Sequence, residues 1–211
     1  MVIAVDGPAA SGKGTIAKAL ARHFGLPHLD TGKLYRACGL AVRLAGEDPF
    51  DAAAAERAAL TMAPALLDDP HLMSALNSDY ASIVSSHPAV RAALFDRQRD
   101  FAAQPGGAVL DGRDIGTVIA PDASAKLFVT ARTDVRAARR HAELVRGGDG
   151  RDFSAVLADI EARDARDSGR SAAPLKRAGD AALLDTSDLA IDAAVRAAVA
   201  LVEKALAANS Q

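Results

Sequence analysis

The sequence predicts an α/β fold with a parallel sheet covered by helices, and three observations support this. Short apolar runs alternate with longer helical patterns along the 211 residues. Half of the residues are hydrophobic but only 4% are aromatic, which favours close-packed helices over a β-sandwich. The apolar runs end in polar residues, and ligands bind beyond the carboxyl ends of parallel strands. These strand-end residues are Asp6, Asp30, Asp111, Thr130 and Asp185.

Five apolar runs are expected to be strands, because each is short and bounded by polar or turn residues. They cover residues 2–5, 26–29, 108–110, 125–130 and 181–184. The helices expected around them have apolar or alanine-rich patterns at helical spacing. They cover about 16–25, 32–45, 52–67, 77–85, 88–103, 133–146 and 191–207, with a further basic helix after the glycine-rich break at 147–150.

Particular residues explain where these helices begin and end. Gly25 is expected to end the first helix as a C-cap. The segment Asp68-Asp-Pro70 breaks the alanine-rich helix, and Pro88 opens the next long one. Thr31 and Thr133 are each expected to cap the helix that follows.

The segment from Gly7 to Thr15 follows the G-x-x-x-x-G-K pattern of a phosphate-binding loop and lies between a predicted strand and a predicted helix. Glycines let the backbone curl around an anion, and the helix N-terminus adds inward N–H groups and a favourable dipole. Lys13 supplies a mobile positive charge for the outer phosphates. An ordinary strand-to-helix turn is the alternative. Gly14 stands where a Mg²⁺-binding hydroxyl usually follows the lysine, and the hydroxyl comes one residue later, at Thr15.

Three further segments combine acids and arginines. Asp30–Arg36 opens a helix, and Asp111–Thr117 places an acid–base pair between two glycines at a strand end. Arg163, Asp167 and Arg170 are spaced by four and three, so they share one helix face. A plain N-cap, a structural loop and a salt-bridged surface helix are the alternatives. Beside a phosphate loop, such arginines suit phosphoryl transfer, which requires positioning and neutralisation of a charged group.

The composition limits the partners of the protein. A net charge of −2 gives no electrostatic case for nucleic acid or an anionic membrane, and no apolar run approaches a membrane span in length. Cys38 is the single cysteine, which rules out an internal disulfide and indicates a reducing compartment; we expect it to be a buried thiol. The first strand begins at residue 2, so we expect no signal peptide and a cytoplasmic location. The histidines do not form paired zinc spacings.

Four segments together resemble bacterial cytidylate kinase in order and spacing over nearly the whole chain. They read G-P-A-A-S-G-K-G-T, L-D-T-G-K-L-Y-R, D-G-R-D-I-G-T-V and R-D-A-R-D-S-G-R-S-A-A-P-L. The resemblance implies transfer of the ATP γ-phosphoryl group to CMP or dCMP, with Mg²⁺ held mainly through phosphates and water. It also implies a monomer with one P-loop kinase domain and a five-stranded parallel core. The core would cover 1–46, 86–140 and 171–211, with an NMP-binding insertion at about 47–85 and a short lid at about 141–170.

The same resemblance assigns roles to residues at matching positions. Catalysis is expected from Lys13, Arg36 and Arg113, with Arg36 and Arg113 on the acceptor phosphate. The residues expected to bind ATP are Gly7, Pro8, Ala9, Ala10, Ser11, Gly12, Lys13, Gly14 and Thr15, together with the lid arginines Arg139 and Arg140. The residues expected to bind CMP are Thr31, Arg36, Ser82, Arg91, Arg113, Asp114, Arg163, Asp167 and Arg170. Of these, Ser82, Arg91, Asp114 and Arg170 would surround the cytosine, and Arg163 and Asp167 would meet the sugar. A carboxylate at Asp114 suits cytosine because it can accept from the exocyclic amine that uracil lacks.

The chain departs from the family pattern between about Ala65 and Asn77. The family has a small antiparallel sheet there, and Met73 stands where an arginine is expected. We therefore expect one hairpin or none, and a segment that covers CMP without strong polar contacts. Other small-molecule P-loop kinases and a catalytically inactive P-loop domain are alternatives. A GTPase-like switch is a third, but neither Asn77 nor Asn209 fits the guanine-reading Asn-Lys-x-Asp.

Overall fold

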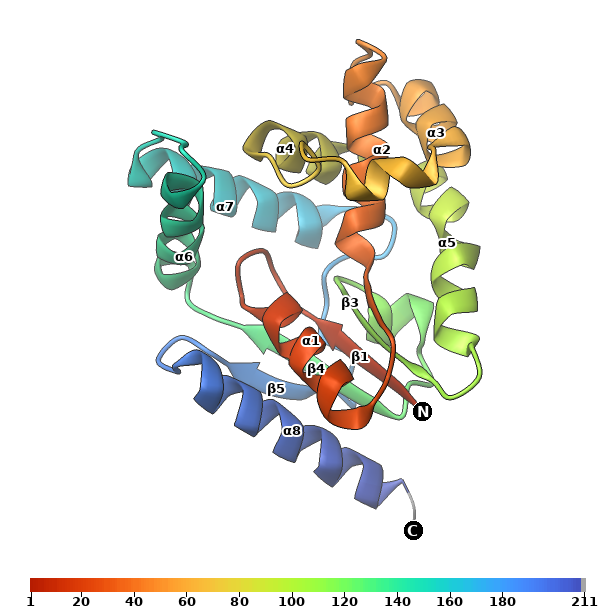
Figure 1. Cartoon of the computed structure of the whole chain (residues 1–211), viewed down its shortest axis with the longest axis vertical. Helices are drawn as coiled ribbons and strands as arrows, with labels where there is room; N and C mark the ends of the chain where they lie inside the picture. Colours follow the sequence, from red (N-terminus) through yellow and green to blue (C-terminus); the bar gives the residue numbers. More distant parts are fainter. Residues whose placement is uncertain (210–211) are drawn as a thin grey trace.

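The sheet is built from five parallel strands in the order β2-β3-β1-β4-β5 (Figure 1). The strands are β1 (Val2–Asp6), β2 (His28–Asp30), β3 (Ala108–Gly112), β4 (Ala125–Thr130) and β5 (Ala182–Asp185). All pairings are parallel, so the carboxyl ends of the strands lie at one edge. The register places Asp30 beside Asp111 and Thr130 beside Asp185. The predicted sheet, and the gathering of polar strand ends along it, are thereby confirmed.

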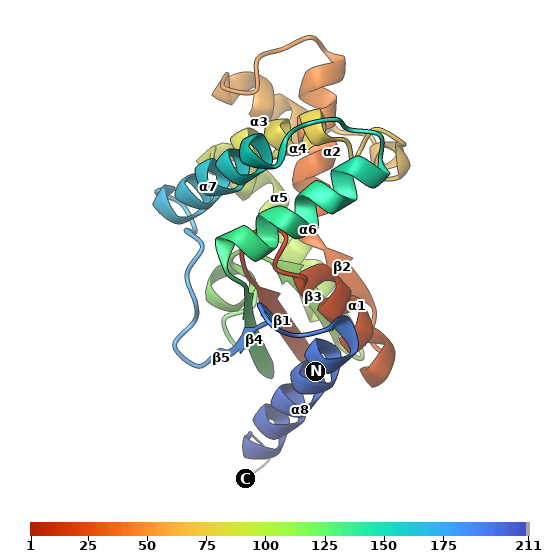
Figure 2. The ribbon, with the colours of Figure 1, turned by 90° about the vertical axis from the view of Figure 1, so that its left-hand side faces the viewer.

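Helices cover both faces of the sheet and form a further layer above its carboxyl edge in this computed structural model, which describes residues 1–209 (Figures 1 and 2). The helices are α1 (Lys13–Phe24), α2 (Thr31–Leu44), α3 (Ala52–Thr61), α4 (Ala75–Val84), α5 (Pro88–Ala103), α6 (Thr133–Arg146), α7 (Phe153–Gly169) and α8 (Ile191–Ala208). Two short helical turns, η1 (Pro64–Asp68) and η2 (Ile115–Ile119), complete the elements. No helix within residues 1–209 combines the length and the apolar character needed to cross a membrane.

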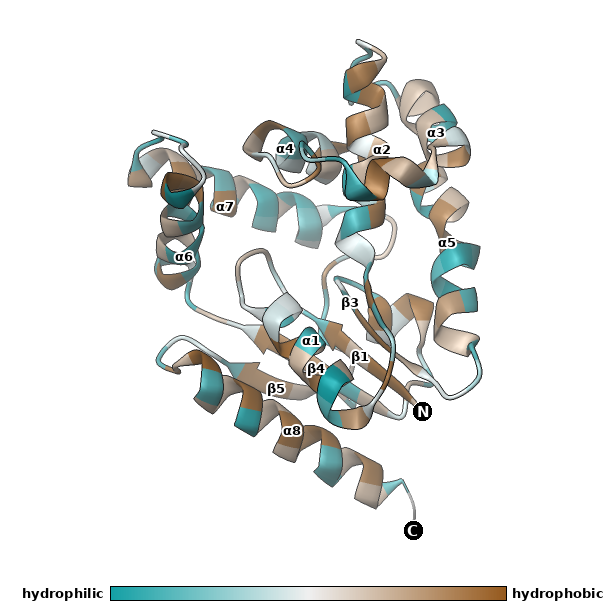
Figure 3. Cartoon of the chain, in the orientation of Figure 1, coloured by the Kyte–Doolittle hydropathy of each residue, from teal (hydrophilic) through white to brown (hydrophobic). Residues whose placement is uncertain are grey.

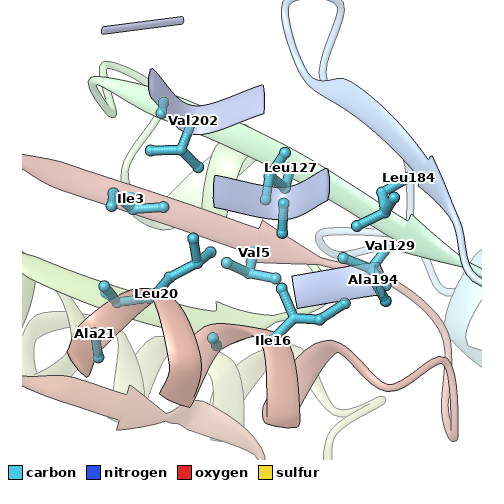
Figure 4. Close-up of a cluster of buried hydrophobic side chains, with 14 residues drawn as sticks. Ile3, Val5, Ile16, Leu20, Ala21, Leu127, Val129, Leu184, Ala194 and Val202 are labelled. Carbon is cyan, nitrogen blue, oxygen red and sulfur yellow. The ribbon is translucent and has the colours of Figure 1, made fainter. Parts of the chain in front are cut away.

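The central strand β1 is buried on both faces, as expected for a parallel strand between two helical layers. Ile3 and Val5 pack against α1 and α8, whereas Ala4 packs with residues of β3, α5 and η2 on the opposite face. Figure 4 shows the first cluster, in which Leu20 of α1 and Val202 of α8 approach the strands. In Figure 3 the strands are predominantly hydrophobic, while helix surfaces alternate between hydrophobic and hydrophilic stripes. Such burial fixes the strands that carry the polar edge.

A second core lies between α2, α3, α4 and α5, away from the sheet. Cys38 is fully buried there, and its thiol donates to the carbonyl of Ala55 at 3.4 Å. Burial raises the pKa of the Cys38 thiol to about 12, which suits an inert core residue. The expected buried cysteine is thus confirmed.

The alanine-rich helix ends earlier than the expected range of 52–67. Helix α3 stops at Thr61, and the short turn η1 begins at Pro64. Proline disfavours helical backbone at the residue before it, so the helix cannot run continuously through Ala63 into Pro64. No strand forms between residues 31 and 107, so the reduced insertion contains no hairpin. Helix α4 begins at Ala75, because the Ser74 side chain caps it by accepting from the Asn77 N–H at 3.3 Å.

Two predicted caps are wrong and one is correct. Gly25 closes α1 in the left-handed conformation at φ 65°, as expected. Thr31 and Thr133 are the first helical residues and not the caps, and their hydroxyls bond elsewhere. The Thr31 hydroxyl donates to the carbonyl of Asp111 at 2.8 Å, and that of Thr133 accepts from Arg136 at 3.0 Å. The Thr31 hydroxyl thus bonds a residue of β3, whereas the Thr133 hydroxyl is occupied by an arginine in the first turn of its own helix.

The contact between α2 and α4 depends on Gly39. A Cβ added there would lie 2.8 Å from the amide nitrogen of Ala81 and 3.0 Å from the carbonyl carbon of Tyr80. Both neighbours are backbone atoms, which cannot rotate away as a side chain would. Only glycine therefore permits this approach between the two helices.

We expect Gly39→Ala to lower the free energy of unfolding by at least about 1 kcal/mol, since overpacking typically costs 1–3 kcal/mol. Urea denaturation followed by circular dichroism measures the change. Gly169→Ala is the matched control, because a Cβ at Gly169 would meet no atom within 4 Å. That variant should be neutral or slightly stabilised. Equal stability of Gly39→Ala and the natural protein would contradict the proposed close contact.

Candidate active site

The conformation of the glycine-rich loop between β1 and α1 requires glycine at particular positions. A Cβ at Gly7 would lie 2.0 Å from the carbonyl oxygen of Val129, so this position excludes every other residue. Gly12 precedes α1 at φ 86°, a left-handed conformation, and supplies no side chain to cap the helix. The first N–H groups of α1 are consequently left for an anion, next to Lys13.

Two cavities adjoin this loop. One has a volume of about 340 Å³ and the other of about 500 Å³. Both are lined by Ala10, Ser11, Gly12, Thr15 and Arg140, so the loop separates two connected spaces. The charged residues Lys18, Asp30, Asp111 and Glu143 line part of the smaller cavity. The same cavity also brings together five cationic residues from five different segments, Lys13, Arg36, Arg113, Arg140 and Arg163. We call these five residues the cationic cluster.

The cationic cluster carries more positive charge than its surroundings neutralise. Burial, followed by the charge of Arg113, lowers the pKa of Lys13 to about 7 and that of Arg163 to about 9. Burial and the nearby Arg140 also lower the pKa of Arg36. The Lys13 ammonium has one weak partner, the carbonyl of Pro8 at 3.3 Å. An anionic ligand would relieve this repulsion.

Asp167 of α7 provides the main carboxylate for these cations. It accepts from Arg113 Nε at 2.7 Å and lies 3.8 Å from Arg170 Nη1 and 4.0 Å from Arg163 Nε. Although burial alone would raise the pKa of Asp167, the positive charges of Arg113 and Arg163 lower it to about 2. The predicted helix-face cluster is therefore present, and it also orients Arg113.

A separate acidic group lies beside a cavity of about 360 Å³ that is lined by Tyr35, Arg91 and Asp114. Arg91 donates to one oxygen of Asp114 and lies over the Tyr35 ring at 5.3 Å. The other oxygen of Asp114 lies 3.7 Å from Arg170 Nη2, a buried nitrogen without a hydrogen-bond partner among the described residues. A hydrogen-bond acceptor and an unused donor thus lie next to each other.

Ser82 and Thr31 are not joined to this group by direct hydrogen bonds. The Ser82 hydroxyl accepts from Arg166 Nε at 3.1 Å, which connects α4 to α7. The Thr31 hydroxyl is used on the carbonyl of Asp111, where it holds the start of α2 against β3. Both residues are buried next to the cavities, but the geometry gives them supporting contacts.

The two adjacent arginines of α6 have different surroundings. Arg139 lines the larger cavity and donates to the hydroxyl and the carbonyl of Thr186 at 3.0 and 2.7 Å. The Thr186 hydroxyl also lies 3.0 Å from the carbonyl of Ser11, so the loop after β5 holds the glycine-rich loop. Arg140 lines both cavities and donates to Glu143 and Ser78.

Sequence reasoning missed several residues that support the site. Asp6 accepts from the amides of Ile115 and Gly116 at 2.8 and 2.7 Å. Burial raises the pKa of Asp6 to about 6 despite these bonds. Its position at a strand end was visible, but its partners lie 109 and 110 residues away. Ser78 and Thr186 gave no comparable signal.

Arg136 of α6 uses its whole guanidinium to join three parts of the site. Nε donates to the carbonyl of Ala131, and Nη1 donates to the carbonyl of Ala9 in the glycine-rich loop. Nη1 and Nη2 also form a bidentate pair with Asp164 of α7 at 3.0 and 2.6 Å, while Nη2 reaches Thr133. The signal for Asp164 was present, since it lies within the R-D-A-R-D segment. This half-buried pair fixes α6 and α7 relative to the loop.

Comparison with known proteins identifies similar sequences along nearly the whole chain. The family profile described as cytidylate kinase matches residues 3–204. A cytidylate kinase of Xanthobacter autotrophicus is 60% identical over 203 residues, which cover 96% of this chain and 97% of that protein. One from Methylobacterium sp. is 61% identical with the same coverage, and one from Methylocella silvestris is 57% identical over 97% of this chain and 95% of its own.

A solved structure supports the fold alone. The crystal structure of an uncharacterised protein from Eubacterium ventriosum aligns with a TM-score of 0.54 and 16% sequence identity. The alignment covers 96% of this chain and 98% of that one.

Because the pKa of Lys13 is about 7, this lysine is mostly neutral at pH 8 in the free protein. A bound polyphosphate favours the charged form, so binding should take up a proton at pH 8 and much less at pH 6, where Lys13 is already protonated. Calorimetric titration with tripolyphosphate in two buffers of different ionisation enthalpy measures this uptake. Lys13→Ala is the control for protons exchanged by the ligand itself. Equal uptake in both proteins would contradict the lowered pKa.

Proposed function

The chain belongs to the cytidylate kinase family, which transfers the γ-phosphoryl group of ATP to CMP or dCMP, and from that premise we propose how its residues carry out the reaction. The cationic cluster is the observation that carries the proposal. It surrounds one cavity beside the glycine-rich loop with half-buried, incompletely neutralised positive charge. Phosphoryl transfer depends on this kind of preorganised charge.

We propose that residues 7–15 hold the ATP phosphates through their backbone amides and that Lys13 neutralises the migrating phosphoryl group. The uncapped start of α1 supports this assignment. The larger cavity is assigned to the rest of ATP, with Arg139 and Arg140 in its wall. Arg139 is already tied to Thr186, so it presents a fixed surface to the nucleotide.

Arg36 and Arg113 are assigned to the acceptor phosphate, which lies across the loop from ATP in this proposal. Their support is that both line the smaller cavity together with Lys13. The Asp167 carboxylate accepts from Arg113 Nε, and Nη1 makes a long bond of 3.4 Å to the Gly112 carbonyl, so Nη2 is left for the phosphate. The donor and acceptor phosphates then approach each other with little change in the protein, which is what a positioning catalyst requires.

The pairing of Asp114 with Arg170 is assigned to the cytosine. A carboxylate oxygen can accept from the exocyclic amine, while the unused Arg170 Nη2 can donate to the neighbouring ring nitrogen. Arg91 and Tyr35 complete this side of the cavity. Ser82 and Thr31 are assigned supporting roles through their bonds to Arg166 and to the Asp111 carbonyl. The sugar is assigned to Asp167 and to Arg163, whose buried Nε has no hydrogen-bond partner among residues 1–209.

Mg²⁺ is proposed to accompany ATP, held mainly through phosphates and water. Among residues 1–209 no group of three or more histidine, cysteine or acidic side chains preforms a metal cage. Asp30, Asp111 and the Thr15 hydroxyl line the cavity beside Lys13, and Mg²⁺ prefers such oxygen atoms while keeping several waters. When bound, the ion neutralises charge on the β- and γ-phosphates.

The proposed division of the chain assigns 47–85 to the CMP-binding insertion, about 141–170 to the lid and the remainder to the core. We also propose a monomer, as the resemblance to the family implies. The buried Cys38 and the nucleotide substrates support a reducing, cytoplasmic location.

Release of ADP, coupled to an optical assay, tests the substrate assignment with CMP, dCMP, UMP and AMP as acceptors. We expect CMP or dCMP to give the highest kcat/KM. Lys13→Ala should lower kcat by at least about 10²-fold, the scale of losing one preorganised electrostatic donor. A preference for UMP or AMP would contradict the base assignment, and unchanged turnover in Lys13→Ala would contradict the catalytic one.

Asp114→Ala should lower the CMP:UMP ratio of kcat/KM by about tenfold or more, because it removes a charge-assisted bond to the amine. Asp114→Asn keeps the side-chain volume beside Arg91 and should shift the ratio in the same direction. Steady-state kinetics with both acceptors measures it. Asp122→Asn, an exposed aspartate in the loop before β4, serves as the control. A constant ratio in both Asp114 variants would place base selection elsewhere.

A further inference from the structure

The Ser78 hydroxyl of α4 contacts side chains of α2 and α6, two helices that lie above the sheet with α4 (Figures 1 and 2). It accepts from Arg36 Nη1 at 2.5 Å and from Arg140 Nη2 at 3.2 Å. It also donates to the carbonyl of Ser74 at 3.0 Å. A hydroxyl has one donor and two acceptor positions, so every hydrogen-bonding position of Ser78 is used.

The two arginines that meet at Ser78 would otherwise repel each other. Arg36 and Arg140 both belong to the cationic cluster, and the charge of Arg140 acts against that of Arg36. No carboxylate forms an ion pair with Arg36 among the described residues, whereas Arg140 has Glu143 at 2.8 Å. The neutral oxygen of Ser78 holds both guanidinium groups without cancelling their charge.

The first turn of α4 makes Ser78 a rigid support. Ser74 caps the helix, and the Ser78 hydroxyl bonds back to its carbonyl, which fixes the rotamer. The neighbouring Asn77 is fully buried, and its amide donates to the backbone carbonyl of Arg36 at 3.0 Å. Arg36 is thus held by α4 through both its backbone and its side chain.

This arrangement changes the expectation for the insertion. The absence of an arginine at Met73 suggested a cover with few polar contacts. Met73 does line the smaller cavity, but the polar contacts come from Asn77 and Ser78, directly after it. The shortened segment therefore acts on the acceptor site through an arginine that belongs to α2.

We propose that Ser78 is a positioning residue, which holds Arg36 in place for the acceptor phosphate and, through its bond to Arg140, couples the insertion helix α4 to helix α6. The inference rests on the proposed role of Arg36. It assigns to Ser78 a contribution to CMP affinity that acts through Arg36 and not through contact with the nucleotide.

Ser78→Ala tests this, because alanine maintains the helix while removing the shared acceptor. We expect the Kd of the full-length protein for CMP, measured by calorimetry, to rise about three- to tenfold, as for loss of hydrogen bonds to a charged group. The KM for ATP should change less than the Kd for CMP, because Arg140 retains its ion pair with Glu143. Ser78→Cys is close in size and a poor acceptor, so it should show the same effect if the alanine variant is unstable. Ser86→Ala, whose hydroxyl bonds only the carbonyl of Ile83, is the matched control.

A double-mutant cycle separates positioning from direct contact. In an Arg36→Ala background, Ser78→Ala should weaken CMP binding by less than about twofold, because the residue through which it acts is gone. Full additivity of the two changes, or an unchanged Kd in both Ser78→Ala and Ser78→Cys, would overturn the inference. If Arg36→Ala itself leaves CMP binding unchanged, the assignment of Arg36 to the acceptor phosphate fails as well. If only the Ser78 variants have no effect, that assignment stands and the role of Ser78 does not.

Discussion

Half-buried positive charge around the glycine-rich loop is the constraint on which the rest of the structure depends. Arginines and a lysine repel one another in a low-dielectric site unless each is held by a specific partner. Aspartate carboxylates in different parts of the site provide these partners. Asp167 orients Arg113, Asp114 takes Arg91 and Asp164 takes Arg136. Each pairing fixes an arginine while the site as a whole remains attractive to phosphate.

The scaffold delivers these groups because a parallel sheet collects its strand ends at one edge. Asp6, Asp30 and Asp111 follow three adjacent strands, and the glycine-rich loop follows the central one. Helices α6 and α7 lie over this edge, and the half-buried bidentate pair between them ties their position to the carbonyl of Ala9. The phosphate loop and the lid helices are therefore parts of one hydrogen-bonded frame.

Much of this was predictable from local patterns. Alternating strands and helices gave the sheet, and the glycine spacing identified the loop because its geometry excludes larger residues at Gly7. Spacing on one helix face brought Arg163, Asp167 and Arg170 together. Local pattern failed where partners are distant in sequence. Ser78 meets Arg36 and Arg140 from 42 and 62 residues away, and nothing near Ser78 announces those contacts.

Two predictions, the end of the alanine-rich helix and the threonine caps, were wrong because a stronger restraint outweighed the local sequence signal. The alanine-rich pattern suggested one long helix through residue 67, although Pro64 already argued for a break. Thr31 and Thr133 have the residue type of a cap, but the Thr31 hydroxyl bonds a carbonyl of β3 and the Thr133 hydroxyl accepts from Arg136 of its own helix. In each case the residue was assessed with its neighbours in sequence, while a stronger restraint came from backbone geometry or from tertiary contacts.

The close backbone contact at Gly39 holds α2 and α4 together as one rigid unit. Arg36 lies one turn from Gly39 on α2, and Ser78 lies one turn from the same contact on α4. Helices packed this closely cannot slide past each other, so an outward swing of the insertion carries both residues with it. A displacement of the insertion would therefore withdraw Arg36 from the other four members of the cationic cluster, which lie on other segments. The position of α4 would then set the charge around the acceptor phosphate.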